Sequence, residues 1–276
     1  MRIAFTKMHG LGNDFLLFET TPDQALPTPA QWRQLADRHR GIGFDQAVVF
    51  ATAADATAVA SYRIFNADGG EAEQSGNGAR CAVKLLFLQG RAPGGRVTIE
   101  TRAGLIHGTM HDDGQIAVDM GAPEFEPAAL PFSATARTAT YQLPVGGEVV
   151  EFSAVSMGNP HAVLRVAAVE SAPVERIGRA LQAHPAFPRQ VNVGFMQIID
   201  SAHIRLRVYE RGAGETLACG TGSCAAVAAG RNLGLLGTDV EVHVPGGRLG
   251  VHWDGPGQHV WLTGPAEVAF TGQVDI

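Results

Sequence analysis

Two short segments carry the residues best suited to proton-transfer chemistry, and they are copies of one motif. The first runs from Glu71 to Ser75-Gly76-Asn77-Gly78, and the second from Glu215 to Cys219-Gly220-Thr221-Gly222, 144 positions later. A thiol can remove or deliver a proton near neutral pH, whereas a hydroxyl does not titrate there. Proton transfer that used both segments would therefore have an ionisable group on one side only.

The glycines that follow each nucleophile indicate helix starts that could bind an anion. The first turn of a helix presents unpaired backbone N–H groups and the positive end of the macrodipole, and glycine lets a carboxylate approach closely. The same field predicts a lowered pKa for Cys219, which would make it more thiolate-like than a free cysteine. The alternative is an inert buried thiol, and this is what we expect of Cys81 and Cys224 inside the predicted helix cores.

The repeat extends beyond these segments, which predicts two similar halves. We expect an N-terminal half of residues 1–120 plus 264–276 and a C-terminal half of residues 121–263. The same offset pairs Arg63 with Arg207, Ile64 with Val208, Phe65 with Tyr209, Gly70 with Gly214, Ala82 with Ala226 and Val83 with Val227.

Short strand patterns separated by Gly, Pro and Asn/Asp turns predict an α+β fold, with mostly antiparallel strands around one core helix in each half. The two buried helices are predicted over residues 79–89 and 223–233, each beginning just after the repeated glycine motif. A further helix is predicted over residues 29–39, with Trp32 and Leu35 facing inward.

Composition excludes several classes of protein. The 276 residues are 45% hydrophobic and 17% charged, as in globular domains, and the net charge of -6 gives no reason to expect nucleic acid or an anionic membrane as partner. No stretch approaches the roughly 20 apolar residues of a membrane span. Three cysteines do not make a disulfide scaffold, so we expect a cytoplasmic protein with reduced thiols. Zinc-ligand spacings and nucleotide-binding glycine fingerprints are missing from the sequence, so no metal and no cofactor are expected.

Five long strings stand out in the sequence, residues 7–15, 62–69, 76–81, 156–161 and 207–216. Together they resemble diaminopimelate epimerase, and the similarity needs no large gap. The resemblance implies a cofactor-independent epimerase that interconverts LL- and meso-diaminopimelate, with two pseudo-symmetric domains that are each a β-barrel around a central helix. It also implies a small-molecule substrate and a homodimer, with Phe270 aligned to an aromatic residue at the dimer contact.

The resemblance also assigns roles to single residues. In that family two cysteines act on opposite faces of the substrate α-carbon, one removing a proton as thiolate and the other delivering one as thiol. One corresponds to Cys219 and the other falls on Ser75, so we expect epimerisation to be impaired. His161 and Glu210 match the polar pair that tunes the thiols. The implied substrate-binding residues are Asn13, Gln46, Asn66, Gly76, Asn77, Asn159, Asn192, Glu210, Arg211, Gly220 and Thr221.

Two other functions stay open. A related racemase, epimerase or dehydratase of the proline-racemase type could use a single base, because a hydroxyl partner favours one-sided proton removal. A catalytically silent protein could use the same residues to bind an amino acid.

Without the resemblance, His161 would be interpreted as a turn residue and Glu210 with Arg211 as a surface ion pair. Three further charged residues are expected to cap loops or to pair structurally, namely Asp14, Asp45 and Arg80.

Overall fold

The computed structural model describes residues 2–21, 23–72, 75–134 and 136–276, and it divides into two compact units. Unit 1 comprises residues 1–119 and 264–276, and unit 2 comprises residues 120–263. The described residues form mostly strands, together with four α-helices and two short 3-10 helices at Pro93–Gly95 and Pro127–Ala129. This confirms the predicted α+β class.

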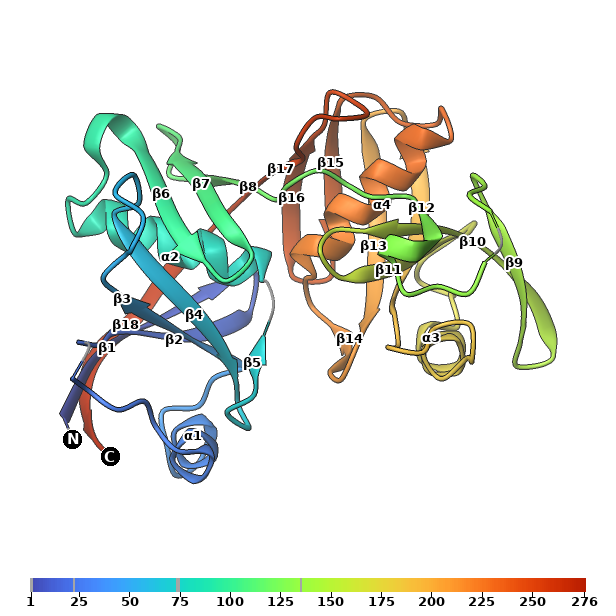
Figure 1. Cartoon of the computed structure of the whole chain (residues 1–276). Helices are drawn as coiled ribbons and strands as arrows, with labels where there is room; N and C mark the ends of the chain where they lie inside the picture. Colours follow the sequence, from blue (N-terminus) through green and yellow to red (C-terminus); the bar gives the residue numbers. More distant parts are fainter. Residues whose placement is uncertain (1, 22, 73–74, 135) are drawn as a thin grey trace. The chain divides into compact units, whose positions relative to one another are not determined.

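Unit 1 contains a sheet in which the first and last strands of the chain lie side by side, with both termini at one end of the pair (Figure 1). The order is β18-β1-β2-β3-β4-β6-β7-β8, and β5 also pairs with β4. The pairs β2–β3 and β4–β6 are parallel and the others are antiparallel. The strands are β1 (Arg2–Gly10), β2 (Asn13–Glu19), β3 (Gln46–Ala51), β4 (Ala60–Asn66), β5 (Glu71–Ala72), β6 (Arg96–Thr101), β7 (Gly104–Met110), β8 (Ile116–Asp119) and β18 (Glu267–Asp275).

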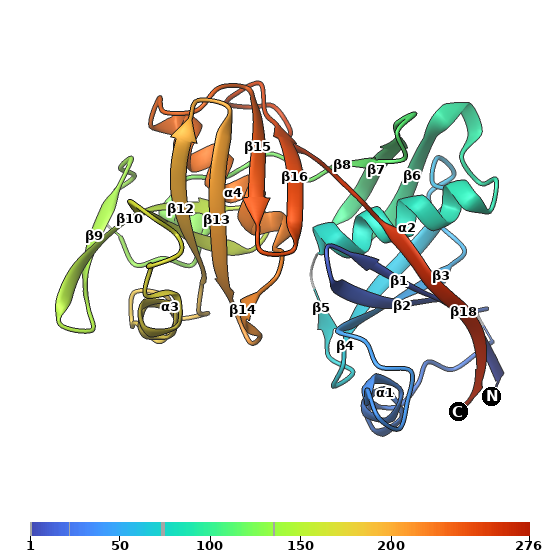
Figure 2. The ribbon, with the colours of Figure 1, turned by 180° about the vertical axis from the view of Figure 1, so that it is seen from behind.

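Unit 2 repeats this topology. Its order is β9-β10-β11-β12-β13-β15-β16-β17, β14 also pairs with β13, and the parallel pairs are β11–β12 and β13–β15. Figure 2 shows β12, β13, β15 and β16 side by side. The strands are β9 (Tyr141–Val145), β10 (Glu148–Ser156), β11 (Pro160–Arg165), β12 (Asn192–Asp200), β13 (His203–Glu210), β14 (Gly214–Thr216), β15 (Asp239–Val244), β16 (Gly247–His252) and β17 (Trp261–Gly264).

One buried helix packs against the strands of each unit. Helix α2 (Gly76–Leu88) contacts β1, β2, β3, β6, β7 and β8, and α4 (Gly220–Asn232) contacts β10, β11, β12, β13 and β16. Both helices begin at the first glycine of the repeated motif, three residues before the predicted starts. The predicted boundary was wrong because Ser75 and Cys219 each cap the helix, so the glycines form its first turn.

The remaining helices cover the sheets. Helix α1 (Pro29–Ala36) begins where predicted, with Trp32 and Leu35 buried, but it ends at Ala36 instead of residue 39. Trp32 packs in a core cluster of unit 1 with Phe18, Phe44 and Phe65. Helix α3 (Val174–Gln182) was not predicted, and its buried residues join the aromatic core of unit 2.

A close approach between α3 and β13 depends on Gly178. A Cβ at this position would lie 2.6 Å from the Cβ and Cγ atoms of Tyr209. Helix propensity alone would make Gly178→Ala stabilising by about 1 kcal/mol. We expect the opposite sign, a loss of roughly 1–3 kcal/mol in the free energy of unfolding, because the buried ring must shift. Urea denaturation of both forms measures the difference, and an unchanged or raised stability would contradict the close packing.

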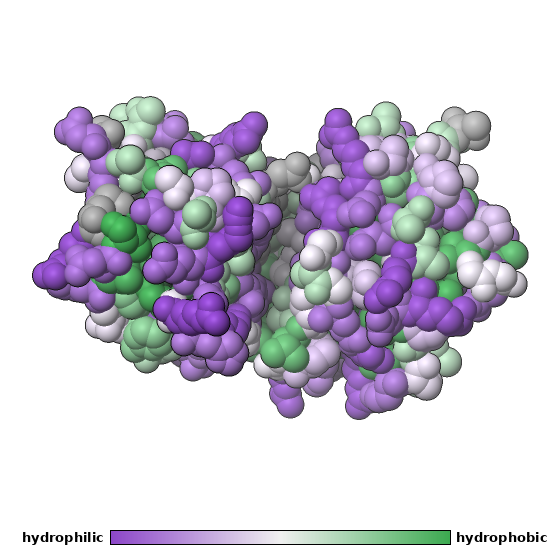
Figure 3. Space-filling model, turned by 90° about the horizontal axis from the view of Figure 1, so that it is seen from below, coloured by the Kyte–Doolittle hydropathy of each residue, from purple (hydrophilic) through white to green (hydrophobic). Residues whose placement is uncertain are grey.

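The face in Figure 3 is mostly hydrophilic over both units, with hydrophobic side chains in small scattered groups. Within the described ranges, no helix has both the length and the apolar character that crossing a bilayer requires.

Candidate active site

Ser75 is the N-cap of α2. Its backbone is extended (φ -144°, ψ 111°), and its Oγ accepts a hydrogen bond from the backbone N–H of Gly78 at 3.2 Å. A Cβ on Gly78 would lie 3.1 Å from the ring of Phe15 and 3.3 Å from the Ser75 hydroxyl. The glycine therefore lets the hydroxyl sit directly on the helix end, where backbone N–H groups are available for an anion.

Cys219 occupies the equivalent place on α4. Its backbone is also extended (φ -118°, ψ 110°), and its Sγ accepts from the N–H of Gly222 at 3.4 Å. The residue is only 3% exposed. The two caps thus have the same local geometry, and they differ in whether the capping atom is oxygen or sulfur.

The environment of Cys219 opposes ionisation. Burial raises the pKa of its thiol well above the ordinary value, and the charge and hydrogen bonding of Glu210 raise the pKa further. Bonds from Thr221 and from the Gly222 N–H act in the opposite direction but are outweighed. The prediction of a lowered pKa was therefore wrong, because desolvation and a neighbouring carboxylate outweigh the helix end. Cys219 rests as a protonated thiol.

A hydrogen-bonded chain connects Cys219 to a buried histidine. The hydroxyl of Thr221 lies 3.6 Å from the Cys219 sulfur, and it accepts from Asn159 Nδ2 at 3.3 Å. Asn159 Oδ1 lies 3.0 Å from His161 Nε2. Because this amide oxygen can only accept, the ring proton of His161 is on Nε2. Burial lowers the pKa of His161 to about 3, with a further contribution from the charge of Arg211, so the imidazole is neutral near pH 7.

Asn192 supports the backbone around this chain. It is 4% exposed, its Nδ2 donates to the carbonyl of Pro160 at 3.1 Å, and its Oδ1 accepts from the N–H of Arg211 at 2.9 Å. Its amide thus ties the start of β11 to the turn after β13, and so fixes the segment that carries both Glu210 and Arg211.

In unit 1, Asn13 has the place that Asn159 has in unit 2. It begins β2 after a tight turn in which Leu11 and Gly12 both have positive φ, 56° and 86°. Asn13 Oδ1 accepts from Asn77 Nδ2 at 3.0 Å, and its own Nδ2 donates to Asp45 at 2.8 Å. The β1–β2 hairpin and the β10–β11 hairpin therefore each place an asparagine on the second residue of the buried helix in the same unit, Asn77 in α2 and Thr221 in α4.

Charged residues hold the unit 1 amides in one orientation. Arg80 is fully buried and donates to Asn77 Oδ1 at 2.9 Å, which leaves the Asn77 amide nitrogen to face Asn13. Arg38 bonds to both Asp14 and Asp45. Burial would raise the Asp14 pKa, but the hydrogen bonds and charges of Arg38 and Lys7 lower it to about 2.

The other predicted residues of unit 1 lie on strands. Gln46 and Asn66 are cross-strand partners on β3 and β4, and Gln46 Nε2 donates to Asn66 Oδ1 at 2.9 Å. Phe270 on β18 is 49% exposed and makes an edge contact with Phe5 at 6.0 Å between ring centroids.

The repeated acidic residues form matched ion pairs. Arg63 contacts both carboxylate oxygens of Glu71 at 2.9 and 2.8 Å, and Arg207 contacts both oxygens of Glu215 at 2.6 and 2.9 Å. Each pair closes the hairpin that precedes a nucleophile, β4–β5 in unit 1 and β13–β14 in unit 2. The glutamate that begins each copy of the motif therefore has a structural role.

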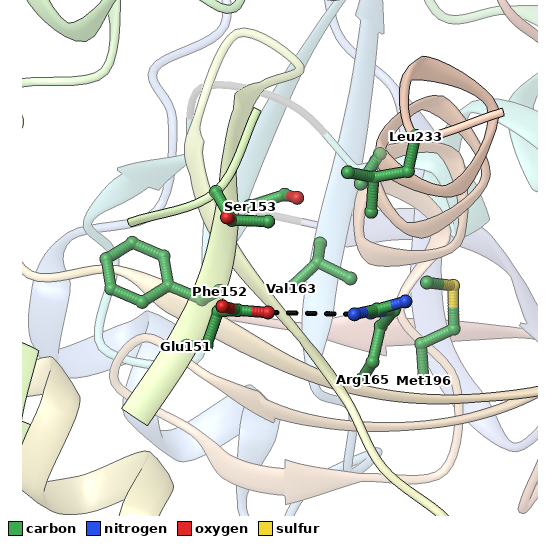
Figure 4. Close-up of a pocket in the computed structure, with 9 residues that line it drawn as sticks. Glu151, Phe152, Ser153, Val163, Arg165, Met196 and Leu233 are labelled. Carbon is green, nitrogen blue, oxygen red and sulfur yellow. Dashed lines mark ion pairs between the residues drawn. The ribbon is translucent and has the colours of Figure 1, made fainter. Parts of the chain in front are cut away.

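A pocket of about 70 Å³ lies elsewhere in unit 2. Figure 4 shows an ion pair between Arg165 and Glu151 across it, 3.6 Å between Nη2 and Oε1. Its helix residues, Ala229 and Leu233, are at the C-terminal end of α4, opposite the end that Cys219 caps. The pocket is therefore separate from the candidate site. Within residues 2–21, 23–72, 75–134 and 136–276, no cluster of three or more His, Cys, Asp or Glu side chains could hold a metal ion.

Each unit thus contributes its own set of the predicted site residues. Sequence reasoning missed Thr216, whose hydroxyl donates to Glu210 Oε1 at 2.5 Å. Unit 1 carries Asn13, Gln46, Asn66, Ser75, Gly76, Asn77 and Phe270, and unit 2 carries Asn159, His161, Asn192, Glu210, Arg211, Cys219, Gly220 and Thr221.

Known proteins match this chain over almost its whole length. A sequence profile of the family described as diaminopimelate epimerase matches residues 5–126 and 153–269. The diaminopimelate epimerase of Alkalilimnicola ehrlichii is 54% identical over 276 residues, which cover 99% of each chain. That of Thioalkalivibrio sulfidiphilus is 52% identical over 278 residues and 100% of both chains.

Solved structures with the same fold are more distant in sequence. A hydroxyproline epimerase from Agrobacterium vitis has a TM-score of 0.73 at 18% identity, over 99% of this chain and 92% of that one. A phenazine biosynthesis protein from Bacillus anthracis has a TM-score of 0.69 at 17% identity, over 100% of both chains. Likeness at these identities extends to the fold and not to the substrate.

Proposed function

The chain belongs to the diaminopimelate epimerase family and is an isomerase, and we propose that it interconverts LL- and meso-diaminopimelate by proton transfer at the α-carbon without a cofactor. The observation that carries the proposal is the Cys219 thiol, which caps α4 while buried beside Glu210. A protonated thiol in this place can deliver a proton to one face of a carbanion, and as thiolate it can remove one from the same face.

The two helix ends supply electrostatic stabilisation. Removing an α-proton places negative charge on the substrate carboxylate, and backbone N–H groups aimed at that charge lower the barrier. Gly76 and Asn77 form the first turn of α2, and Gly220 and Thr221 form the first turn of α4. We assign the reacting carboxylate to these N–H groups.

Polar side chains around the helix ends suit the far end of the substrate, which is a second zwitterionic amino acid. Neutral amides can bind both an ammonium and a carboxylate, and one arginine matches a carboxylate. We assign this end to Arg211 together with Asn13, Gln46, Asn66, Asn159 and Asn192.

Ser75 limits the reaction. In the direction that starts by removing a proton at position 75, the hydroxyl is too weak a base near neutral pH. In the other direction Cys219 can remove the proton only after losing its own, and its raised pKa makes this form scarce. We propose that the protein with serine at position 75 exchanges the substrate α-proton on the Cys219 face far faster than it epimerises the substrate.

Further features follow from the family. We infer that each unit is a β-barrel around its buried helix, which is supported by the contacts of α2 with β1 and β8 and of α4 with β10 and β16, strands at or next to the two ends of their sheets. We also infer a cytoplasmic homodimer that uses the exposed Phe270.

The test is incubation of each diaminopimelate isomer in deuterated water, with proton NMR for α-proton exchange and chiral chromatography for epimerisation. We expect exchange on one isomer, without epimerisation at a comparable rate. Binding without any exchange would instead identify a silent amino-acid-binding protein. Failure to bind diaminopimelate, with turnover of another amino acid, would identify an enzyme of the proline-racemase type.

A further inference from the structure

A threonine on the hairpin before α4 makes a contact that no part of the proposed reaction uses. Strand β14 pairs with β13 so that Thr216 lies opposite Val208 and Glu210 lies opposite Gly214. The Thr216 hydroxyl donates to Glu210 Oε1 at 2.5 Å. A hydroxyl has one proton to give, so the Thr216 donor is committed to this carboxylate.

The hairpin holds that threonine firmly despite the shortness of β14, which has three residues. The neighbouring Glu215 is bound through both carboxylate oxygens by Arg207, and Arg207 also donates to the carbonyl of Val169 at 2.7 Å. A two-point contact of this kind fixes direction as well as distance. The position of Thr216, and through it that of the Glu210 carboxylate, is therefore fixed by the fold.

The matching hairpin of unit 1 lacks the contact. It keeps the bidentate ion pair and the same strand register, with Ile64 opposite Ala72. The counterpart of Thr216 is Ala72, which has no hydroxyl, and the counterpart of Glu210 is Asn66, which accepts from Gln46 instead. A stable hairpin therefore needs neither the threonine nor the carboxylate, and both occur in the unit that carries the thiol.

We propose that Thr216 is a positioning residue, which holds the Glu210 carboxylate against the Cys219 thiol so that this unit rests with its proton on sulfur. A buried thiol beside an anion keeps its proton and donates it to the carboxylate as a hydrogen bond. In the direction that begins with proton removal at position 75, Cys219 is then the proton donor. The inference rests on the proposed function only for the use of that proton, which passes from sulfur to the α-carbon and leaves a thiolate.

Residues from three elements affect the ionisation of the Cys219 thiol. Glu210 on β13 is the charged neighbour that raises the pKa of Cys219, whereas Thr221 at the start of α4 lowers it. His161 on β11 reaches Cys219 through Asn159 and Thr221, and it is neutral because burial lowers its pKa to about 3. Displacing the Glu210 carboxylate should therefore move the Cys219 titration toward lower pH.

The experiment measures the alkylation rate of the Cys219 peptide by iodoacetamide as a function of pH, with mass spectrometry to separate it from Cys81 and Cys224. Thr216→Ala removes the hydroxyl and copies the residue that the unit 1 hairpin already tolerates. We expect it to lower the alkylation midpoint by about one pH unit, equivalent to about tenfold more thiolate at neutral pH. Thr216→Ser should keep the midpoint of the parent protein.

Two controls separate this effect from loosened packing, which would raise the rate at every pH without moving the midpoint. Glu210→Gln should lower the midpoint by itself, and adding Thr216→Ala should cause no further shift, because the two residues act in one chain. Ala72→Thr, the reverse exchange in unit 1, should leave the Cys219 midpoint unchanged.

Three results would overturn the inference: an unchanged midpoint in Thr216→Ala, an equal shift in Thr216→Ser, or a further shift on the Glu210→Gln background. If Thr216→Ala does not fold, Thr216→Val removes the hydroxyl at nearly constant volume and is judged by the same criteria. Alkylation needs no substrate, so a failure here is distinct from a failure of the proposed function, which would appear as lack of α-proton exchange by the parent protein.

Discussion

Ser75→Cys raises the rate of epimerisation of diaminopimelate by about 10²–10⁴-fold, the contribution expected of a positioned general base. The hydroxyl already sits where a thiol is needed, because Ser75 Oγ accepts from the N–H of Gly78 just as Cys219 Sγ accepts from the N–H of Gly222. Exchanging oxygen for sulfur keeps this cap and adds a group that can ionise near neutral pH. Epimerisation of each purified isomer, followed by chiral chromatography, measures the change.

A matched control adds a thiol away from the helix ends. Ser171 is exposed in unit 2, and Ser171→Cys should leave the rate of epimerisation unchanged. Equal rates for the parent protein and Ser75→Cys would show that position 75 is not the missing base. The one-base alternative would then be favoured, since in that reaction Ser75 is not required to ionise.

The repeat made much of the fold predictable. Residues that match at a constant offset lie at matching positions, such as Arg63 with Glu71 on β4–β5 and Arg207 with Glu215 on β13–β14. Helix α3 was missed although its buried residues, Val174, Ile177 and Leu181, have helical spacing. It is only nine residues long, and Gly178 within it favours a turn on propensity alone.

The sequence predicted where the candidate residues lie in the fold better than it predicted their electrostatic environment. The starts of both helices were predicted three residues too late, just after the glycines that follow Ser75 and Cys219. The predicted lowering of the thiol pKa assumed that Cys219 is exposed and distant from carboxylates. The structure shows the reverse, with Cys219 3% exposed and with Glu210 raising the pKa of its thiol. Burial and long-range neighbours depend on packing between strands, which the order of residues along one segment does not report.

Thr216 illustrates a signal that the sequence did contain. The two copies of the motif share a glutamate and two glycines, Glu71/Glu215, Gly76/Gly220 and Gly78/Gly222, and they differ at the nucleophile, Ser75 against Cys219. Among the other positions that differ, Ala72 against Thr216 lies three residues before the nucleophile in each copy. Differences between copies of a repeat mark the positions where the two halves have separate chemical roles.

Cys219→Ala abolishes exchange of the substrate α-proton, with a loss of at least about 10²–10³-fold, because no other thiol can take its place. Cys81 is fully buried within α2, and burial raises its pKa to about 12, so Cys81→Ala is the matched control and should retain exchange.

The pH dependence of α-proton exchange in the parent protein has a definite sign. Since the pKa of Cys219 is raised, its thiolate becomes more abundant as pH increases, and the exchange rate of the parent protein should rise from neutral into alkaline solution. Proton NMR in deuterated buffers measures both effects. Undiminished exchange by Cys219→Ala, or a rate that falls as pH rises, would assign the proton transfer to another group.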